Sequence, residues 1–229
     1  MKNKQEITRK YANYQPNLFK KPEYDMFKIG VLGSPETGKT SLMKRAANNE
    51  FSHIYSSTNF LHHVTIMKES EGAITELQLW ELPPHQKWDS HTNGMHGMMI
   101  LFDVTNPESF RDIKKHLKLV EERCRFGRDQ IMLVGTKSDL VAERKISSDD
   151  VVEYAELMDM IYIDVSNKSG ENVQDVLQIL TEQLRQARRE KEALARGDKM
   201  SGEPENKKDS EDESNKEPEY KPGSSCTIS

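Results

Sequence analysis

The chain has 229 residues with 33 basic and 38 acidic side chains, and its net charge of −5 argues against general nucleic-acid binding. This length allows one domain and a tail, and no apolar run approaches the roughly 20 residues that span a bilayer. Residues 1–10 are polar, without the apolar stretch of a signal peptide, and the only cysteines are Cys124 and Cys226. We therefore expect a protein of the reducing cytosol whose fold needs no disulfide framework.

A polar extension, residues 1–25, precedes the first strong apolar segment. Its aromatic side chains could anchor a partner protein or pack back onto the domain, and packing onto the domain is the favoured interpretation. These aromatic residues are spaced among lysines and prolines: Tyr11, Tyr14, Phe19 and Tyr24.

The central motif of the chain matches the pattern G-x-x-x-x-G-K-[ST] at residues 33–40. It follows an apolar strand predicted at 26–32 and precedes a helix predicted at 41–49, which is the context that this motif requires. In such a loop the backbone N–H groups turn toward a di- or triphosphate, Lys39 adds a positive charge, and the Thr40 hydroxyl can bind Mg²⁺ at a helix N-terminus. The predicted phosphate-binding residues are Gly33, Ser34, Pro35, Glu36, Thr37, Gly38, Lys39 and Thr40.

Strands and helices alternate through the rest of the domain, which is predicted to cover residues 26–196. The other strands are expected at 62–68, 74–82, 98–104, 131–135 and 161–165, with a hairpin turn around residues 71 and 72. This order predicts an α/β fold of the P-loop NTPase type, with six mostly parallel strands flanked by helices.

Helix starts are expected at three polar residues that follow strands. Asn106 caps the first, Ser147 and Asp150 form a capping box for the second, and Asn172 opens the third, which runs to about residue 195. The first of these helices begins at Pro107 and is expected to bury one continuous face: Phe110, Ile113, Leu117, Val120 and Cys124.

Two polar segments follow the fifth and sixth strands, at the strand ends where ligands sit in open α/β sheets. The Asp139 carboxylate can accept hydrogen bonds from the ring N–H and the amine of guanine, which adenine cannot offer, and the backbone around Asn167 can donate to the guanine O6. Either segment alone is typical of a turn with a helix cap, but together they indicate guanine. The predicted base-binding residues are Thr136, Lys137, Asp139, Ser166, Asn167 and Lys168.

With these motifs the chain resembles the Ras superfamily of small GTPases, and the Rab branch most closely, over about residues 27–184. Besides the phosphate loop, the likeness rests on Phe51, on Tyr55 and Thr58 of the effector loop, and on Trp80, which opens the family's W-D-T-A-G-Q motif. The runs at 133–140 and 164–173 complete it. Thr136 stands where most relatives have Asn, but the Rho branch also carries Thr.

The resemblance implies ligands and partners. Phe51 would stack on the base, Tyr55 would belong to the nucleotide site, Thr58 would meet Mg²⁺ and the γ-phosphate when GTP is bound, and Lys137 would flank the base. GTP or GDP with Mg²⁺ would be the cofactors, and effector and regulator proteins of the Rab or Ras type would be the partners. The implied function is a guanine-nucleotide-binding switch protein in membrane traffic or signalling.

Four departures from the family pattern concern hydrolysis. Glu81 replaces an Asp that indirectly holds Mg²⁺, and its extra methylene would displace the carboxylate. Pro84 lacks the N–H with which a family Gly senses the γ-phosphate, and His85, the candidate catalytic residue, replaces the water-positioning Gln. Glu36 replaces a Gly where a Cβ would crowd the attacking water. The segment at 85–103 is also several residues shorter than the corresponding segment of Rab proteins. We expect impaired hydrolysis; the alternative is drift in an unused loop.

The tail from residue 197 to the end combines acidic residues with a terminal cysteine motif. From Asp198 onward it carries nine acids against five lysines, and this composition predicts disorder. The last four residues, Cys226-Thr227-Ile228-Ser229, form a C-a-a-X box whose final Ser predicts farnesylation of Cys226. We therefore expect the protein in the cytosol and, through the lipid, on the cytoplasmic face of a membrane.

Two other functions stay open at this point. A pseudo-GTPase would use the Rab shape as an interaction module that mimics or sequesters Rab partners, and the altered residues at 81, 84 and 85 favour that alternative. A P-loop phosphotransferase is the third candidate, and the segment at 136–139 argues against it.

Overall fold

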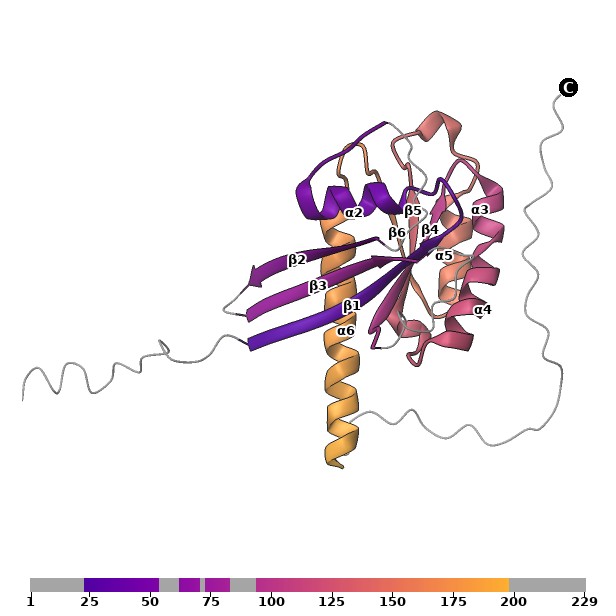
Figure 1. Ribbon diagram of the computed structural model, residues 1–229. Coiled ribbons are helices and arrows are strands. Elements are labelled where there is room, and N and C mark those ends of the chain that lie inside the picture. Colours follow the sequence, from indigo (N-terminus) through magenta and orange to yellow (C-terminus); the bar gives the residue numbers. More distant parts are fainter. Residues whose placement is uncertain (1–22, 54–61, 71–72, 83–93, 198–229) are drawn as a thin grey trace, which may run out of the picture.

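Six strands form one mixed sheet in the computed structural model, which describes residues 23–53, 62–70, 73–82 and 94–197 (Figure 1). They are β1 (Glu23–Gly33), β2 (His62–Ser70), β3 (Ala73–Glu81), β4 (Gly97–Asp103), β5 (Ile131–Thr136) and β6 (Ile161–Val165). Their spatial order is β2-β3-β1-β4-β5-β6. β2 runs antiparallel to β3, as the hairpin prediction requires, and the other neighbours are parallel. The predicted α/β fold is confirmed.

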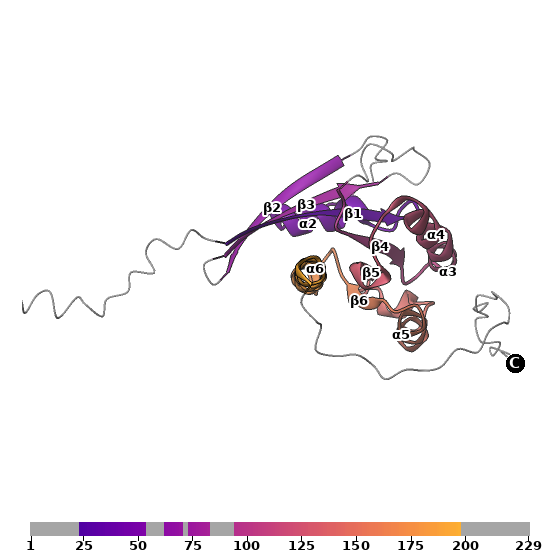
Figure 2. The same ribbon diagram turned by 90° about the horizontal axis from the view of Figure 1, so that it is seen from below.

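Helices cover both faces of this sheet. α2 (Lys39–Asn48) and α6 (Val173–Arg196) pack on one apolar core, and α3 (Pro107–Arg111), α4 (Ile113–Arg123) and α5 (Ser148–Leu157) pack on a second. Figure 2, which looks along α6, shows that helix apart from α3, α4 and α5. Among the described helices none combines the length and apolar character needed to cross a membrane. The residues of β1 that reach the first core alternate, as a strand requires: Phe27, Ile29 and Val31.

The helix expected from Pro107 onward is divided into α3 and α4. Asn106 caps the start of α3 with its side chain, as expected. Asp112 stands between the two helices, and its carboxylate accepts hydrogen bonds from Ser34 Oγ at 2.9 Å and Lys115 Nζ at 2.7 Å. Helical hydrogen bonds nevertheless continue at Asp112, whose N–H donates to Glu108 O and whose carbonyl accepts from the His116 N–H, each at 3.0 Å, so the predicted helix is interrupted at this one residue only. The expected apolar face is nevertheless buried across the break: Phe110, Ile113, Leu117 and Val120.

Two further helix starts differ in detail from the expectation. The Ser147 side chain accepts a hydrogen bond from the Asp149 N–H at 3.2 Å, one residue before the Asp150 of the expected capping box. Asn172 precedes α6 with a φ of 58°, and its side-chain amide donates to Asp164 O at 2.8 Å. Asn172 thus holds the start of α6 against the end of β6.

Asp25 joins the first strand to the last helix. Its carboxylate accepts hydrogen bonds from Arg185 Nε at 2.9 Å and from Arg188 Nη1 at 2.7 Å. Arg188 also donates to Met26 O at 2.9 Å, and its guanidinium lies 4.3 Å from the ring centre of Phe27. The Asp25 side chain is 16% exposed, so these pairs are partly shielded from water and from salt. The second half of α6 is thereby fastened to the N-terminal part of β1.

Cys124, which follows the last residue of α4, is partly buried against the second core, and burial raises the pKa of its thiol to about 11. Its thiolate fraction at pH 8 should therefore be roughly a hundredfold below that of an exposed cysteine. In a Cys226→Ser variant, we expect Ellman's reagent to label the native chain about two orders of magnitude more slowly than the chain unfolded in guanidinium. Equal rates in both states would show that the thiol is not shielded.

Candidate phosphate-loop site

The loop between β1 and α2 has a backbone that only glycine accommodates at Gly38. Gly38 has a φ of 83°, and a Cβ there would lie 2.8 Å from Asn167 Nδ2. Glu36 also lies in the left-handed region, with a φ of 63°, which costs a residue with a Cβ about 1–2 kcal/mol. Glu36 therefore occupies a backbone position that suits glycine better.

The Lys39 side chain folds back over the loop that precedes it. Its ammonium donates to Gly33 O at 3.0 Å and to Ser34 O at 2.9 Å, and Lys39 is only 8% exposed. Burial lowers the pKa of Lys39, while the negative charge of Glu81 opposes that shift. The Thr37 hydroxyl donates to Ser34 O at 2.8 Å and holds the same turn. The loop thus keeps a buried positive charge in a fixed place.

Thr40 and Glu81 face each other at the start of α2. Thr40 Oγ1 donates to Glu81 Oε2 at 2.7 Å, and Glu81, the last residue of β3, is 4% exposed. The extra methylene of Glu81, expected to displace the carboxylate, leaves it in contact with the Thr40 hydroxyl. The pair therefore places a carboxylate oxygen and a hydroxyl oxygen together, and both are ligand types that Mg²⁺ accepts.

Ser166 orients the carboxylate that is predicted to recognise guanine. Its hydroxyl donates to Asp139 Oδ1 at 2.7 Å and accepts a hydrogen bond from the Ser169 N–H at 3.0 Å. Ser166 is fully buried, so this contact is shielded from competing water. The segments that follow β5 and β6 are therefore in direct contact, as their positions in the sequence predict.

The same two segments also contact the phosphate loop. The buried Thr136 hydroxyl lies 2.8 Å from Thr37 O and 2.9 Å from Phe102 O, and Asn167 Nδ2 donates to Gly38 O at 3.1 Å. Thr37 O and Gly38 O belong to the loop and Phe102 O to β4, so these bonds hold the loop against the ends of the strands.

Lys137 adopts a φ of 64° beside this contact and pairs with Asp103 across the ends of β4 and β5. The Lys137 Nζ lies 2.6 Å from Asp103 Oδ2, and the Asp103 side chain is 9% exposed. The ammonium is thereby held by Asp103 at the carboxyl end of the sheet.

Arg45 of α2 is a site residue that the sequence analysis missed. Its Nε donates to Asn167 O at 2.7 Å, and a second guanidinium nitrogen donates to Lys168 O at 2.5 Å. The guanidinium carbon lies 5.9 Å from the ring centre of Phe51. Arg45 thus connects the segment after β6 with the aromatic residue predicted to stack on the base. Asn167 and Lys168 are 122 and 123 positions from Arg45 in the chain, so no local pattern could reveal these two contacts.

A second missed cluster lies beneath the phosphate loop. Ser34 Oγ, besides its bond to Asp112, lies 3.3 Å from His116 Nε2, and both Ser34 and His116 are buried. The cluster ties the second residue of the loop to the first turn of α4. Only the folded chain brings these side chains together, because Ser34 and His116 are 82 positions apart.

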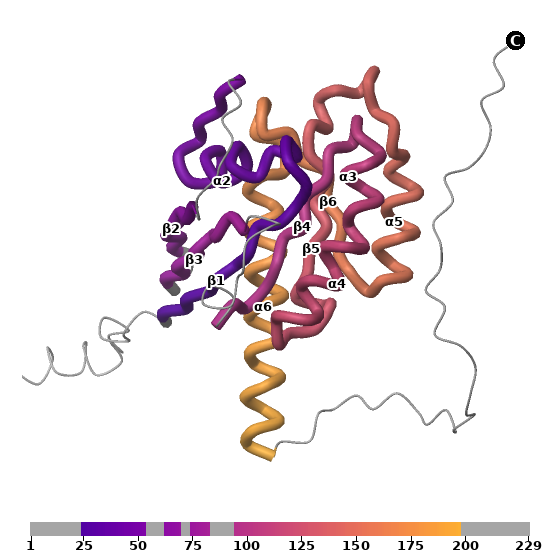
Figure 3. The backbone as a smooth tube through the Cα atoms, turned by 45° about the vertical axis from the view of Figure 1, so that its right-hand side comes forward, coloured from indigo at the N-terminus to yellow at the C-terminus, as the bar shows by residue number. Residues whose placement is uncertain are grey.

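The segments after β1, β5 and β6 gather at one end of the molecule, while the last turns of α6 point to the other end (Figure 3). The structure therefore brings together the residues predicted from the phosphate loop and from the two base-binding segments. Several residues singled out by the sequence lie outside the described residues: Tyr11, Tyr14, Phe19, Tyr55, Thr58, Pro84, His85 and Cys226.

This fold and this loop define the chain as an α/β protein of the Ras-like P-loop type. Residues 28–186 match the sequence profile of the Ras family, and the chain belongs to that family. It is 32% identical to Ras-related protein RabY of Dictyostelium discoideum, over 70% of each chain. It is 29% identical to GTP-binding protein YPTM2 of Zea mays and 28% identical to GTP-binding protein ypt1 of Schizosaccharomyces pombe, in each case over 72% of this chain and 83% of the relative.

Proposed function

We propose that this chain is a Rab-like guanine-nucleotide-binding protein that acts as a switch in membrane traffic. The names of its relatives, which include a Ras-related Rab protein and two GTP-binding proteins, support a guanine nucleotide as the ligand and the Rab branch as the place in the family. One structural observation carries the proposal: Ser166 orients the Asp139 carboxylate, while Thr136 and Asn167 join that region to the phosphate loop. A guanine nucleotide would be held at both ends, with its base on Asp139 and its phosphates on the loop around Lys39.

Magnesium fits the oxygen pair formed by Thr40 and Glu81. Both side chains carry oxygen atoms, and the buried Glu81 carboxylate brings a negative charge next to the start of α2. We assign the direct contact to Thr40 and an indirect one, through water, to Glu81, with Thr58 as a further candidate from the sequence. The ion would supply positive charge that neutralises the phosphates. The chain's own residues would orient it.

Impaired hydrolysis is part of the proposal. The positive φ of Glu36 supports it, because a long acidic side chain stands on a backbone position suited to glycine at the edge of the phosphate site. In the sequence, Pro84 and His85 also favour impaired hydrolysis, because they replace the family's γ-phosphate-sensing Gly and its water-positioning Gln. The alternative, a pseudo-GTPase that works only as an interaction module with Rab partners, shares these features and differs in its nucleotide exchange.

Membrane attachment is proposed to come from a farnesyl group on Cys226. A single lipid of this kind gives marginal and reversible attachment unless a second signal joins it. The tail has a net charge of −4 from Asp198 onward, which anionic leaflets would repel. The protein would therefore divide between the cytosol and the cytoplasmic face of a membrane, and effector and regulator proteins would decide where it stays.

Identification of the copurifying nucleotide tests the proposed function. We expect mass spectrometry and chromatography of the purified, denatured chain to find GDP or GTP, and excess GTP, but not excess ATP, to displace a labelled guanine nucleotide. Equal displacement by ATP would contradict guanine recognition and favour a phosphotransferase. Rates of single-turnover hydrolysis and of nucleotide exchange, measured on the same sample, separate a slow GTPase from a pseudo-GTPase.

A further inference from the structure

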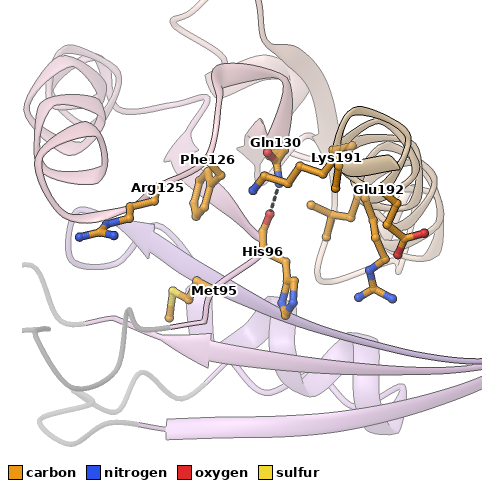
Figure 4. Close-up of a pocket in the computed structure, with 11 residues that line it drawn as sticks. Met95, His96, Arg125, Phe126, Gln130, Lys191 and Glu192 are labelled. Carbon is orange, nitrogen blue, oxygen red and sulfur yellow. Dashed lines mark hydrogen bonds between the residues drawn. The ribbon is translucent and has the colours of Figure 1, made fainter. Parts of the chain in front are cut away.

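A hollow of about 250 Å³ lies at the end of the sheet away from the phosphate loop (Figure 4). It opens between the residues before β4, the segment between α4 and β5, and the second half of α6. Gln130 Nε2 donates to His96 O at 2.6 Å and closes its inner wall. His96 and Gln130 directly precede two parallel strands, whereas Asp139 and Ser166 follow strands. The hollow therefore lies at the amino ends of the parallel strands, and the proposed nucleotide site lies at their carboxyl ends.

The lining of the hollow combines an apolar floor with a cationic rim. Met95, Phe126 and Leu184 supply apolar surface. Figure 4 shows Lys191 extending from α6 toward Gln130, with Arg125 at the far side. Such a lining suits an aromatic side chain accompanied by carboxylates.

Two basic side chains of the rim make no ion pair with the described part of the fold. Arg188 is paired with Asp25, and the rim contains one acid, Glu192. Among the described residues neither Arg125 nor Lys191 makes an ion pair. Burial and the neighbouring Arg188 lower the pKa of His96, so the imidazole adds no charge at neutral pH. Arg125 and Lys191 are therefore available to an anionic ligand.

We propose that this hollow binds residues 217–220 of the chain's own C-terminal tail, Glu-Pro-Glu-Tyr. Tyr220 is the single aromatic residue after α6, and it follows Glu217 and Glu219 closely. Its ring would lie on the apolar floor beside Phe126, while the two carboxylates face Lys191 and Arg125. Charge complementarity favours the tail over the N-terminal extension, because the tail has a net charge of −4 from Asp198 onward, whereas residues 1–22 carry six basic side chains and one acidic one.

The position of α6 makes this contact easy to reach. Ala195, close to the helix end at Arg196, already lines the hollow, so the tail starts at its rim. Tyr220 stands 23 positions beyond Gly197, and a flexible linker of that length spans roughly 26 Å on average. A segment tethered at this distance acts at an effective concentration in the millimolar range. Even a weak contact would therefore be populated, and it would leave only five residues between the bound Tyr220 and Cys226.

A paramagnetic label on Cys226 tests the contact in the full-length, unprenylated chain. In a Cys124→Ser background, a nitroxide on Cys226 should broaden the amide signals of Phe126, Ala187 and Ala195 severalfold more than those of β2. Tyr220→Ala and Lys191→Glu should each remove most of this difference, and circular dichroism checks that both variants fold. Tyr11→Ala, an aromatic deletion in the basic extension, is the matched control and should change nothing.

A charge exchange completes the test. Combining Lys191→Glu with Glu219→Lys should restore the broadening, because the ion pair is reversed rather than removed. Broadening that survives both Tyr220→Ala and Lys191→Glu, or that is equal over the whole surface, would overturn the proposal. Vesicles containing phosphatidylserine that bind the chain through Lys191, with no tail contact in their absence, would also overturn it, because the occupant would then be a membrane. None of these outcomes depends on nucleotide binding.

Discussion

Replacing Asp139 with alanine is expected to weaken GDP and GTP binding by roughly a hundredfold or more, which corresponds to about 3 kcal/mol. Asp139→Ala removes the acceptor for two hydrogen bonds, so the bound base would keep two buried donors without partners. It also leaves the Ser166 hydroxyl without the carboxylate to which it donates at 2.7 Å. Isothermal titration or competition with a fluorescent guanine nucleotide measures the loss.

Ser166→Ala is the matched control for this substitution. It keeps the Asp139 carboxylate and removes only the hydroxyl that orients it, so the expected loss is about 1 kcal/mol, or roughly fivefold. Guanine selectivity over adenine should survive in Ser166→Ala and disappear in Asp139→Ala. If Asp139→Ala still preferred GTP over ATP by the wild-type ratio, the base would be recognised elsewhere in the molecule.

Combining Glu36→Gly, Pro84→Gly and His85→Gln is expected to raise the single-turnover rate of GTP hydrolysis by well over tenfold. Positioning of the attacking water and contact with the γ-phosphate each contribute large factors to this chemistry. Glu36→Gly also removes a side chain from a backbone with a φ of 63°. A quench-flow assay of the preloaded protein measures the rate, with an excess of Mg²⁺ present.

The single variant Glu36→Gly separates strain from chemistry in this experiment. It should raise the free energy of unfolding by about 1 kcal/mol, since glycine tolerates the left-handed conformation, whether or not hydrolysis changes. A wild-type hydrolysis rate already typical of Rab proteins would contradict the expectation of impairment. A triple variant as slow as the wild type would show that the cause lies elsewhere.

The fold could be predicted from sequence because each strand is a short apolar run bounded by polar turns. β5 and β6 fall within one residue of their expected limits, and β1 extends further toward its N-terminus, to Glu23. The phosphate loop was equally accessible, since its function depends on the consecutive residues 33–40. In both cases the structure is determined by residues that are consecutive in the chain, so the sequence pattern alone predicts it.

The contacts that organise the site around the loop could not be predicted in this way. Arg45 donates hydrogen bonds to Asn167 and Lys168, and Asp112 accepts one from Ser34. These residues are distant in the chain and lie close together only because the helices pack on the sheet. A carboxylate in a helical pattern, such as that of Asp112, gives no sign that it accepts a hydrogen bond from a distant hydroxyl. Side chains that act across the sheet leave no periodic trace in the sequence.

The clamp that Asp25 forms with Arg185 and Arg188 has a mechanical consequence. A tether attached beyond Gly197 would pull along the axis of α6, and the two arginines hold that helix sideways against β1. The pulling force would then be parallel to the contact between α6 and β1, and it would act on both ion pairs at the same time. It would not unwind the helix one turn after another. Force applied at the tail would thus reach β1, the strand whose far end leads directly into the phosphate loop.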